Sequence, residues 1–318
     1  MNFLSSFTHV LFVMLEIFFT AMWGFIFYRR NLLTSEALKG LSNLTINLFL
    51  PCLVFSHLIN NFSFNSYQHW WIYPLLGIIV SVVGALVAGF FSLFHKDFLE
   101  KREFVSLIAF QNCGYLPLVI VSRIFSAPLS EELFVNIFLF IQGFNLIFWS
   151  MGVSFLGGEK PRGLRLRSFV NTPFLSLVLS LIIISLGMRE LIPKGIMQAT
   201  QSIGNCTLPV ALVTLGAVLG AGSGKVNNLK RLFFEVALSK MVVIPLLMLI
   251  FIIVVKLPKA MALVLLLEAA MPSAVTLSVV SFNQNSRFGF ISQGVLLTHF
   301  LAIFTVPLLL GLFSLFVK

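Results

Sequence analysis

Long apolar segments separated by short polar stretches occupy almost the whole chain. A helix of about 20 apolar residues crosses the hydrocarbon core of a membrane, so this pattern predicts an all-α polytopic membrane protein with ten transmembrane helices. The expected bounds are Phe7–Tyr28, Leu38–Ile59, Trp70–Phe94, Phe104–Ile124, Glu132–Phe155, Val170–Leu186, Ile196–Leu219, Leu232–Val255, Ala260–Phe282 and Phe288–Phe316.

The composition excludes a water-soluble protein. Of the 318 residues, 58% are hydrophobic and 10% are charged, and the mean hydropathy is +1.02. The first apolar segment is longer than that of a signal peptide and follows no basic residue, so we expect a retained helix. Cys52, Cys113 and Cys206 lie inside predicted helices without the spacing of a disulfide framework or a metal site. Neither a metal nor a cofactor is predicted.

The basic residues report topology rather than nucleic-acid binding. The formal net charge is +10, but the Lys and Arg residues are scattered among short loops, with no compact basic domain. Fourteen of them lie in or beside the odd-numbered loops and six on the opposite face. By the positive-inside rule, the odd loops are cytoplasmic and both termini are extracytoplasmic. No nucleic-acid partner is expected.

The chain divides into two halves of five predicted helices. The longest polar connection, GGEKPRGLRLRS, lies between the fifth and sixth helices, which gives one repeat over 1–156 and a second over 169–318. Because five is an odd number, the second set of helices starts from the opposite side of the membrane. The sequence therefore predicts a 5+5 inverted repeat, as in many secondary transporters.

Prolines lie in the middle of matching helices of the two halves. Pro117 and Pro272 are 155 residues apart, and Pro51 and Pro209 are 158 residues apart. Proline removes a backbone donor and clashes with the preceding turn, so an interruption is expected at each of them. Irregular backbone at membrane depth is tolerated where protein buries it or where it lines a wet cavity, and half-helix N-termini there favour an anion. The alternative is a set of proline kinks that serve packing.

The residues beside these breaks form the predicted substrate site. In the fourth and ninth helices they are Gln111, Asn112, Cys113, Gly114, Tyr115, Pro117, Met271, Pro272, Ser273 and Thr276. Asn43 and Asn47, which precede Pro51, either reach the substrate or form hydrogen bonds between helices.

Two charged residues lie deep in predicted helices, where a charge is expensive. Glu268 is either a proton-coupling group or a carboxylate hydrogen-bonded to the broken backbone. Lys240 either extends towards the cytoplasm, the interpretation that we favour, or faces the crossing, where its ammonium could hold a substrate carboxylate or replace a coupling cation. Glu16 and His299 have no obvious partner in the sequence, and His299 is interpreted as a packing residue.

Several segments together resemble the auxin efflux carrier family, which includes bacterial malate or malonate permeases and PIN-like carriers. The most specific is LLEAAMPSAVTLSVVSF in the ninth helix. The others are NLTINLFLPCLVF, QNCGYLPL, NTPFLSLVLSLIIISLG, LPVALVTLGAVLG and LLTHFLAIFTVPLLLG. Four residues separate Asn112 from Pro117, a spacing closer to that of the PIN-like carriers, so auxin is not carried over as the substrate.

The resemblance implies broken fourth and ninth helices that cross, and an elevator mechanism. It further implies a scaffold of helices 1, 2, 6 and 7, often dimeric, and a moving transport domain of helices 3–5 and 8–10.

The sequence as a whole favours a secondary active transporter for a small organic anion, such as an auxin-like or dicarboxylic acid, driven by membrane potential or protons. The alternative is a sodium-coupled symporter of the bile-acid type. An ATP-driven pump lacks support because GxxxxGK[ST] is absent, and an enzyme lacks support because no nucleophile and base pair is apparent. The expected location is the cell membrane, with the endoplasmic reticulum as the alternative. The expected partners are the anion, the lipid bilayer and a second copy bound through the scaffold.

Overall fold

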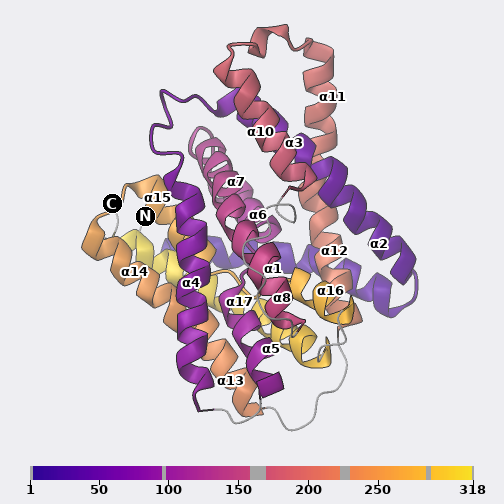
Figure 1. Cartoon of the computed structure of the whole chain (residues 1–318), viewed down its shortest axis with the longest axis vertical. Coiled ribbons are helices and arrows are strands. Elements are labelled where there is room, and N and C mark those ends of the chain that lie inside the picture. The colour runs from indigo at the N-terminus through magenta and orange to yellow at the C-terminus, as the bar shows by residue number, and fades with distance from the viewer. Residues whose placement is uncertain (1–2, 95–97, 158–169, 223–229, 284–287, 317–318) are drawn as a thin grey trace.

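The computed structural model describes residues 3–94, 98–157, 170–222, 230–283 and 288–316, and within these ranges it is helical, without a β-strand (Figure 1). The elements are α1 (Phe3–Arg29), α2 (Ser35–Leu44), η1 (Thr45–Phe49), α3 (Leu50–Asn61), α4 (Ile72–Ser92), α5 (Phe98–Ala109), α6 (Tyr115–Ile124), α7 (Leu129–Ile147), η2 (Phe148–Gly152), α8 (Val153–Leu156), α10 (Thr172–Ser185), η3 (Arg189–Leu191), α11 (Lys194–Asn205), α12 (Thr207–Ala221), α13 (Lys230–Leu238), η4 (Ser239–Val243), α14 (Ile244–Val255), α15 (Lys259–Ala269), α16 (Thr276–Asn283) and α17 (Phe288–Phe316).

Seven helical stretches in the described part of the chain are long and apolar enough to cross a membrane. They match the predicted first, second, third, fifth, seventh, eighth and tenth helices, so a polytopic membrane protein is confirmed. The sixth predicted helix corresponds to the shorter α10, and the fourth and ninth are interrupted. The predicted seam at 157–168 lies almost entirely outside the described residues.

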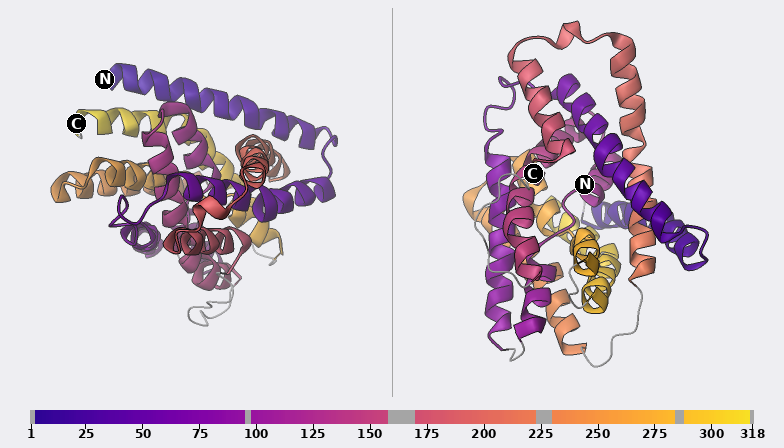
Figure 2. Two further views of the ribbon diagram at one scale, coloured as in Figure 1. Left: turned by 90° about the horizontal axis from the view of Figure 1, so that it is seen from above. Right: turned by 45° about the vertical axis from the view of Figure 1, so that its right-hand side comes forward.

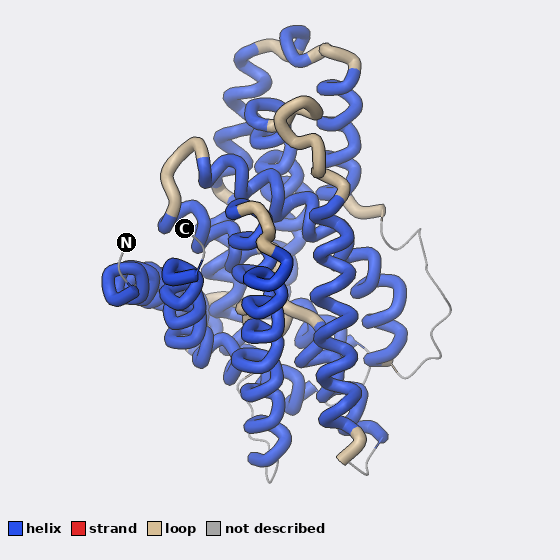
Figure 3. Tube along the Cα trace, turned by 90° about the vertical axis from the view of Figure 1, so that its left-hand side faces the viewer, coloured by secondary structure: helices blue, strands red, loops and turns tan. Residues whose placement is uncertain are grey.

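The helices are joined mostly by short loops (Figure 3). Helices α1 and α17 contact each other and run alongside one another, and the two chain ends lie near each other (Figure 2). The α10–α11 hairpin contacts α3 and extends beyond the other helices at one end of the molecule (Figure 1). Its helix α10 begins at an N-cap, where the Asn171 side chain accepts a hydrogen bond from the Phe174 N–H (2.9 Å).

The fourth predicted helix is interrupted before its proline. Helix α5 ends at Ala109 and α6 begins at Tyr115, so Pro117 lies in the first turn of α6. The expectation of a break at Pro117 was therefore wrong. The first N–H groups of a helix have no intrahelical partner, so a proline in the first turn forgoes no hydrogen bond. Pro272, in contrast, lies inside the gap between α15 and α16.

Pro51 does not interrupt its helix, contrary to expectation. A π turn, η1, precedes it, in which the Leu50 N–H donates to the Thr45 carbonyl five residues back. The same arrangement precedes Pro245, where the Ile244 N–H donates to the Ser239 carbonyl. The wider turn moves aside the carbonyl with which the proline ring would clash, so the helix continues. Near Pro209 the helix is interrupted at Cys206, and the proline again lies in the first turn of the next helix.

Two helix pairs approach each other backbone to backbone at reciprocal glycines. A Cβ placed on Gly24 of α1 would overlap the Val213 carbonyl of α12, and one on Gly216 of α12 would overlap the Ala21 carbonyl of α1. Gly77 of α4 and Gly143 of α7 make the same reciprocal contact with each other's helix backbones. Small residues of this kind let transmembrane helices approach backbone to backbone.

Candidate functional site

The two interrupted segments lie side by side, as predicted, and hydrogen-bond to each other. The Asn112 N–H donates to the Pro272 carbonyl (2.8 Å), and the Ala274 N–H donates to the Phe110 carbonyl (2.9 Å). These bonds form an antiparallel bridge between Gln111 and Ser273. The bridge satisfies backbone groups that the breaks remove from their helices, which a buried segment requires.

In the two interrupted segments, the residues that correspond to each other are the bridging residues and not the prolines. Pro272 immediately precedes the bridging Ser273, whereas Pro117 comes six residues after the bridging Gln111. The two prolines therefore do not occupy equivalent positions, although their spacing suggested that they would.

Hydrogen bonds to α5 and α17 hold the bridge in place. The Ser273 hydroxyl donates to the Leu107 carbonyl (2.6 Å), and the Ser273 N–H donates to the Thr298 hydroxyl (3.2 Å). His299 Nδ1 bonds to the Val295 carbonyl (2.8 Å) and must therefore carry its proton. The other ring nitrogen, Nε2, then accepts from the Asn112 amide (3.2 Å). His299 is thus a buried residue with both ring nitrogens bonded, in agreement with its interpretation as a packing residue, and its partner Asn112 belongs to the predicted site.

One side of the bridge is open. A Cβ placed on Gly114 would have no atom within 4 Å, and Gly114 and Tyr115 are half-buried at the N-terminus of α6. Thr276, at the start of α16, is exposed. Gln111 is fully buried, and neither of its amide atoms has a hydrogen-bond partner among the described groups. A buried amide without a partner is uncommon and needs an explanation.

The remaining predicted residues of the two breaks are buried. Cys113, Met271, Pro272 and Ser273 lie inside the protein, and Pro117 is buried in α6. They shape the site and hold its backbone, whereas Gly114, Tyr115 and Thr276 are at least partly exposed.

Lys240 and Glu268 both lie inside the protein. Both side chains are fully buried. Neither the Lys240 ammonium nor the Glu268 carboxylate has a hydrogen-bond partner in the described part of the chain. The favoured interpretation of Lys240 as a side chain that extends to the cytoplasm was therefore wrong. Lys240 lies in the π turn η4, and such turns are frequent at functional sites.

Three other polar residues that the sequence analysis named are exposed. Glu16 of α1 forms an ion pair with Arg123 of α6 (3.2 Å), and about half of each side chain is exposed. Asn47 is exposed and accepts a hydrogen bond from the Thr172 hydroxyl of α10 (2.9 Å), which is the helix-joining alternative. Asn43 is also exposed.

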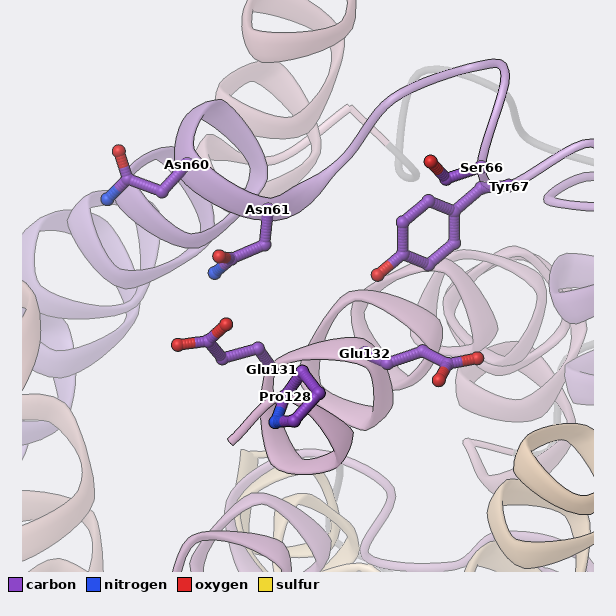
Figure 4. Close-up of a pocket in the computed structure, with 7 residues that line it drawn as sticks. All are labelled: Asn60, Asn61, Ser66, Tyr67, Pro128, Glu131 and Glu132. Atoms are coloured by element: carbon purple, nitrogen blue, oxygen red, sulfur yellow. The ribbon is translucent and has the colours of Figure 1, made fainter. Parts of the chain in front are cut away.

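A separate cavity of about 460 Å³ lies between the end of α3, the following loop and the start of α7 (Figure 4). Its lining is polar and acidic, and consists of Asn60, Asn61, Ser66, Tyr67, Pro128, Glu131 and Glu132. Burial, and then the carboxylates of Glu132 and Glu131, raise the pKa of Tyr67 to about 12, so its phenol is neutral at physiological pH. Two carboxylates and no cation make this cavity a poor site for an anion.

A family model described as membrane transport protein matches residues 9–164 and 159–310. The chain belongs to this family. The resemblance to auxin efflux carriers is thereby confirmed, and membership of the membrane transport protein family places the chain among transporters rather than enzymes.

Three curated relatives of this family member are similar over part of its length. An uncharacterized transporter of Saccharomyces cerevisiae is 28% identical over 160 residues, which are 46% of this chain and 27% of the relative. One of Schizosaccharomyces pombe is 28% identical over 111 residues, 35% of this chain and 25% of the relative. The protein PIN-LIKES 2 of Arabidopsis thaliana is 32% identical over 97 residues, 30% of this chain and 21% of the relative. The matched part of this chain thus spans about a quarter of each relative.

Proposed function

We propose that this protein is a secondary active transporter that moves a small organic anion, a carboxylate, across the cell membrane by an elevator-type mechanism. The observation that carries the proposal is the paired break, which brings a buried amide without a partner, Gln111, to the same segment as the open space at Gly114. Half-helix N-termini at a membrane interior are the usual place for an anionic substrate.

The proposed architecture has ten membrane segments in a 5+5 inverted repeat over 1–156 and 169–318. Seven long helices, the short apolar α10 and the two interrupted segments α5–α6 and α15–α16 account for ten. The reciprocal backbone bonds between the two breaks support an inverted relation, since each segment donates to the other in the same way.

The proposed scaffold contains α1, α2–α3, α10 and α11–α12, and the proposed transport domain contains the other helices. The glycine contacts support this division, because the α1–α12 pair lies within one part and the α4–α7 pair within the other. Between the two parts, α1 and α6 are joined by the half-exposed ion pair of Glu16 and Arg123. Such a pair is weak and reversible, as a sliding boundary requires.

In this proposal the substrate carboxylate lies at the N-terminus of α6, near Gly114, Tyr115 and Thr276. The Gln111 and Asn112 amides orient it, and Lys240 supplies the compensating charge. Asn43 and Asn47 are kept as weaker candidates on the scaffold side. The termini are placed on the extracytoplasmic side, and a homodimer through the scaffold is retained as the assembly.

A thermal-shift screen of the purified protein tests the proposal. Auxins, other monocarboxylates, dicarboxylates and amino acids are added to the detergent-solubilised chain. A ligand at a hundredfold excess over its Kd stabilises the folded state by about 2.7 kcal/mol, so an organic anion should raise the melting temperature. If only neutral or cationic compounds do so, the anion assignment fails.

The alternative is a sodium-coupled organic anion symporter of the bile-acid type. It is tested by replacing sodium with N-methylglucamine in the same screen. The proposal expects an unchanged shift, because Lys240, buried in a π turn that contacts α5 and α17, is proposed to take the place of a coupling cation. A ligand shift that appears only in sodium favours the alternative.

A further inference from the structure

We infer that the ion pair between Glu16 of α1 and Arg123 of α6 is a latch, which holds the proposed transport domain at one position along the scaffold and parts when that domain moves. The inference rests on the proposed function, in which α1 belongs to the scaffold and α6 to the moving part. It adds the two residues that fix one of the access states, whatever the substrate.

The pair lies at membrane depth and is open to its surroundings. Arg123 Nη1 and Glu16 Oε1 are 3.2 Å apart, and 57% of the Arg123 side chain and 52% of the Glu16 side chain are exposed. Glu16 lies in the middle of α1, a helix long enough to cross the membrane, and Arg123 lies in the last turn of α6. A charge at the middle of a membrane helix is costly in hydrocarbon, so a half-exposed pair there indicates that water reaches the boundary between the two helices.

Each end of the latch is fixed to its own part of the molecule. Helix α1 is bound to α12 by the reciprocal backbone contacts of Gly24 and Gly216. Helix α6 begins just after the bridge, where the Asn112 N–H donates to the Pro272 carbonyl (2.8 Å), and it packs against α7. A movement of one part along the other therefore changes the distance between Glu16 and Arg123.

The sequence of the neighbouring helices allows the pair at one register only. Glu16 is the only acidic residue of α1, and Arg123 is the only Lys or Arg of α6. Helix α12, which also contacts α6, and α17, which also contacts α1, contain no Asp, Glu, Lys or Arg. One turn away from Glu16 on either side, α1 exposes Phe12 and Phe19. Displacement of α6 by one turn of α1, about 5.4 Å, thus leaves Arg123 without a carboxylate on these helices.

Other contacts between the two parts can slide. His57 of α3 stacks on Phe134 of α7 with ring centroids 4.6 Å apart, and Gly311 of α17 lies against the side chains of Phe3 and Phe7 in α1. Apolar contacts have no fixed direction, so a shifted surface can find equivalent ones, whereas an ion pair weakens as its charges separate. The charged contact is therefore the one that distinguishes one position from another.

Removal of the pair should move the population towards the other position. Glu16→Gln keeps the shape of the side chain and removes its charge. Because a half-exposed pair contributes modestly, we expect the ratio of the other position to the present one to rise about two- to fivefold. Glu16→Arg sets two guanidinium groups against each other and should shift the ratio further. Glu16→Arg combined with Arg123→Glu restores opposite charges and should return the ratio to that of the wild type.

Pulsed electron paramagnetic resonance of the purified full chain in lipid nanodiscs, without ligand, measures these populations. Cys52→Ser and Cys206→Ser leave only the buried Cys113. Spin labels at Gly195→Cys in α11 and Ser126→Cys after α6 report the distance across the boundary, since both positions are exposed. Labels at Gly195→Cys and Leu32→Cys, both on the scaffold, form the control pair and should keep one distance in every variant.

The wild type should show a main distance across the boundary that matches the structure, and Glu190→Gln, at an exposed carboxylate outside the membrane helices, should behave as the wild type. An unchanged distance distribution in both Glu16→Gln and Glu16→Arg overturns the inference. A double charge reversal that stays shifted also overturns it, because the loss then does not arise from the pairing of the two charges.

Salt tests the latch in the wild type alone, so a variant that fails to fold does not protect the inference. Raising the ionic strength from about 0.01 M to about 1 M shortens the Debye length from about 30 Å to about 3 Å. We expect the wild type to shift as Glu16→Gln does, and Glu16→Gln to show no further shift. A wild-type distribution that is the same at both ionic strengths overturns the latch.

These outcomes are distinct from those of the proposed function, because no substrate is used. Stabilisation by an organic anion in the thermal-shift screen, together with label distances that never change, leaves an anion transporter without the latch. Label distances that respond to charge and salt as expected, with no organic anion bound in the screen, keep the latch and overturn the anion assignment.

Discussion

At the scale of single residues, the site depends on polar groups that proteins rarely bury without a reason. Gln111, Lys240 and Glu268 are all fully buried and lack hydrogen-bond partners among the described groups. Leaving such groups unpaired costs about 1–3 kcal/mol each, and more for the charged ones. Three of them near one irregular stretch of backbone are hard to explain by packing and are consistent with a ligand.

Asn112 is the residue whose replacement tests the site most directly. Its amide is positioned by His299, and its backbone belongs to the bridge. A hydrogen bond to a charged group is worth about 1.5–3 kcal/mol, so Asn112→Ala should weaken anion binding roughly tenfold or more. Asn47→Ala, at an exposed amide bonded to Thr172, is the matched control and should leave the Kd unchanged. Equal affinities in the two variants, measured by calorimetry, would move the site away from the bridge.

The sequence predicted part of this site and missed the rest for a physical reason. Asn112, Lys240 and Glu268 stood out because polar groups at membrane depth are unusual. The partner of Asn112, His299, is 187 residues away in the chain, and no local pattern links the two. The partner of Glu16, Arg123, lies at the end of the predicted fourth helix, and a helix periodicity cannot show how two helices approach each other.

At the scale of helices, proline was a good marker of irregular backbone and a poor marker of its position. Pro117 and Pro209 lie in the first turns of helices that begin after the interruptions, and Pro51 and Pro245 follow π turns that keep the helix continuous. A proline is compatible with each of these arrangements, because neither requires a hydrogen bond from the backbone N–H that proline lacks. Only the three-dimensional context selects among them.

The glycine contact between α1 and α12 predicts that two Gly→Ala substitutions change the stability of the protein in opposite directions. Alanine favours a helix over glycine by about 1 kcal/mol, so Gly40→Ala, whose Cβ would meet no atom within 4 Å, should stabilise the protein by up to that amount. Gly216→Ala places the same methyl against the Ala21 carbonyl and should destabilise it by about 1–3 kcal/mol. Thermal unfolding in detergent measures both. Melting temperatures that rise in both variants would contradict the close approach of these helices.

At the scale of the whole molecule, the apolar surface and the seven long helices fix a membrane location, while orientation rests on charge. Most of the basic residues that set the predicted orientation lie in or beside segments outside the described residues, such as 158–169 and 223–229. The orientation therefore stays a prediction from the sequence.

Labelling of single cysteines tests the predicted orientation in the membrane. The exposed Cys206 is first replaced by serine, and Asn65→Cys or Leu32→Cys is then introduced at an exposed loop position. In intact cells an impermeant maleimide should label the cysteine at 65, between α3 and α4, and spare the one at 32, between α1 and α2. Permeabilised cells, in which both should react, provide the control. The opposite pattern would place both termini in the cytoplasm.

The ion pair between Glu16 and Arg123 bears on how fast such a transporter could turn over. Half-exposed pairs of this kind contribute about 0–1 kcal/mol, and salt screens them. If α6 slides along α1 in each cycle, parting this pair slows the step by about fivefold at most, since each 1.36 kcal/mol is a factor of ten in rate. The contact can therefore define a resting position for the moving part without limiting its speed.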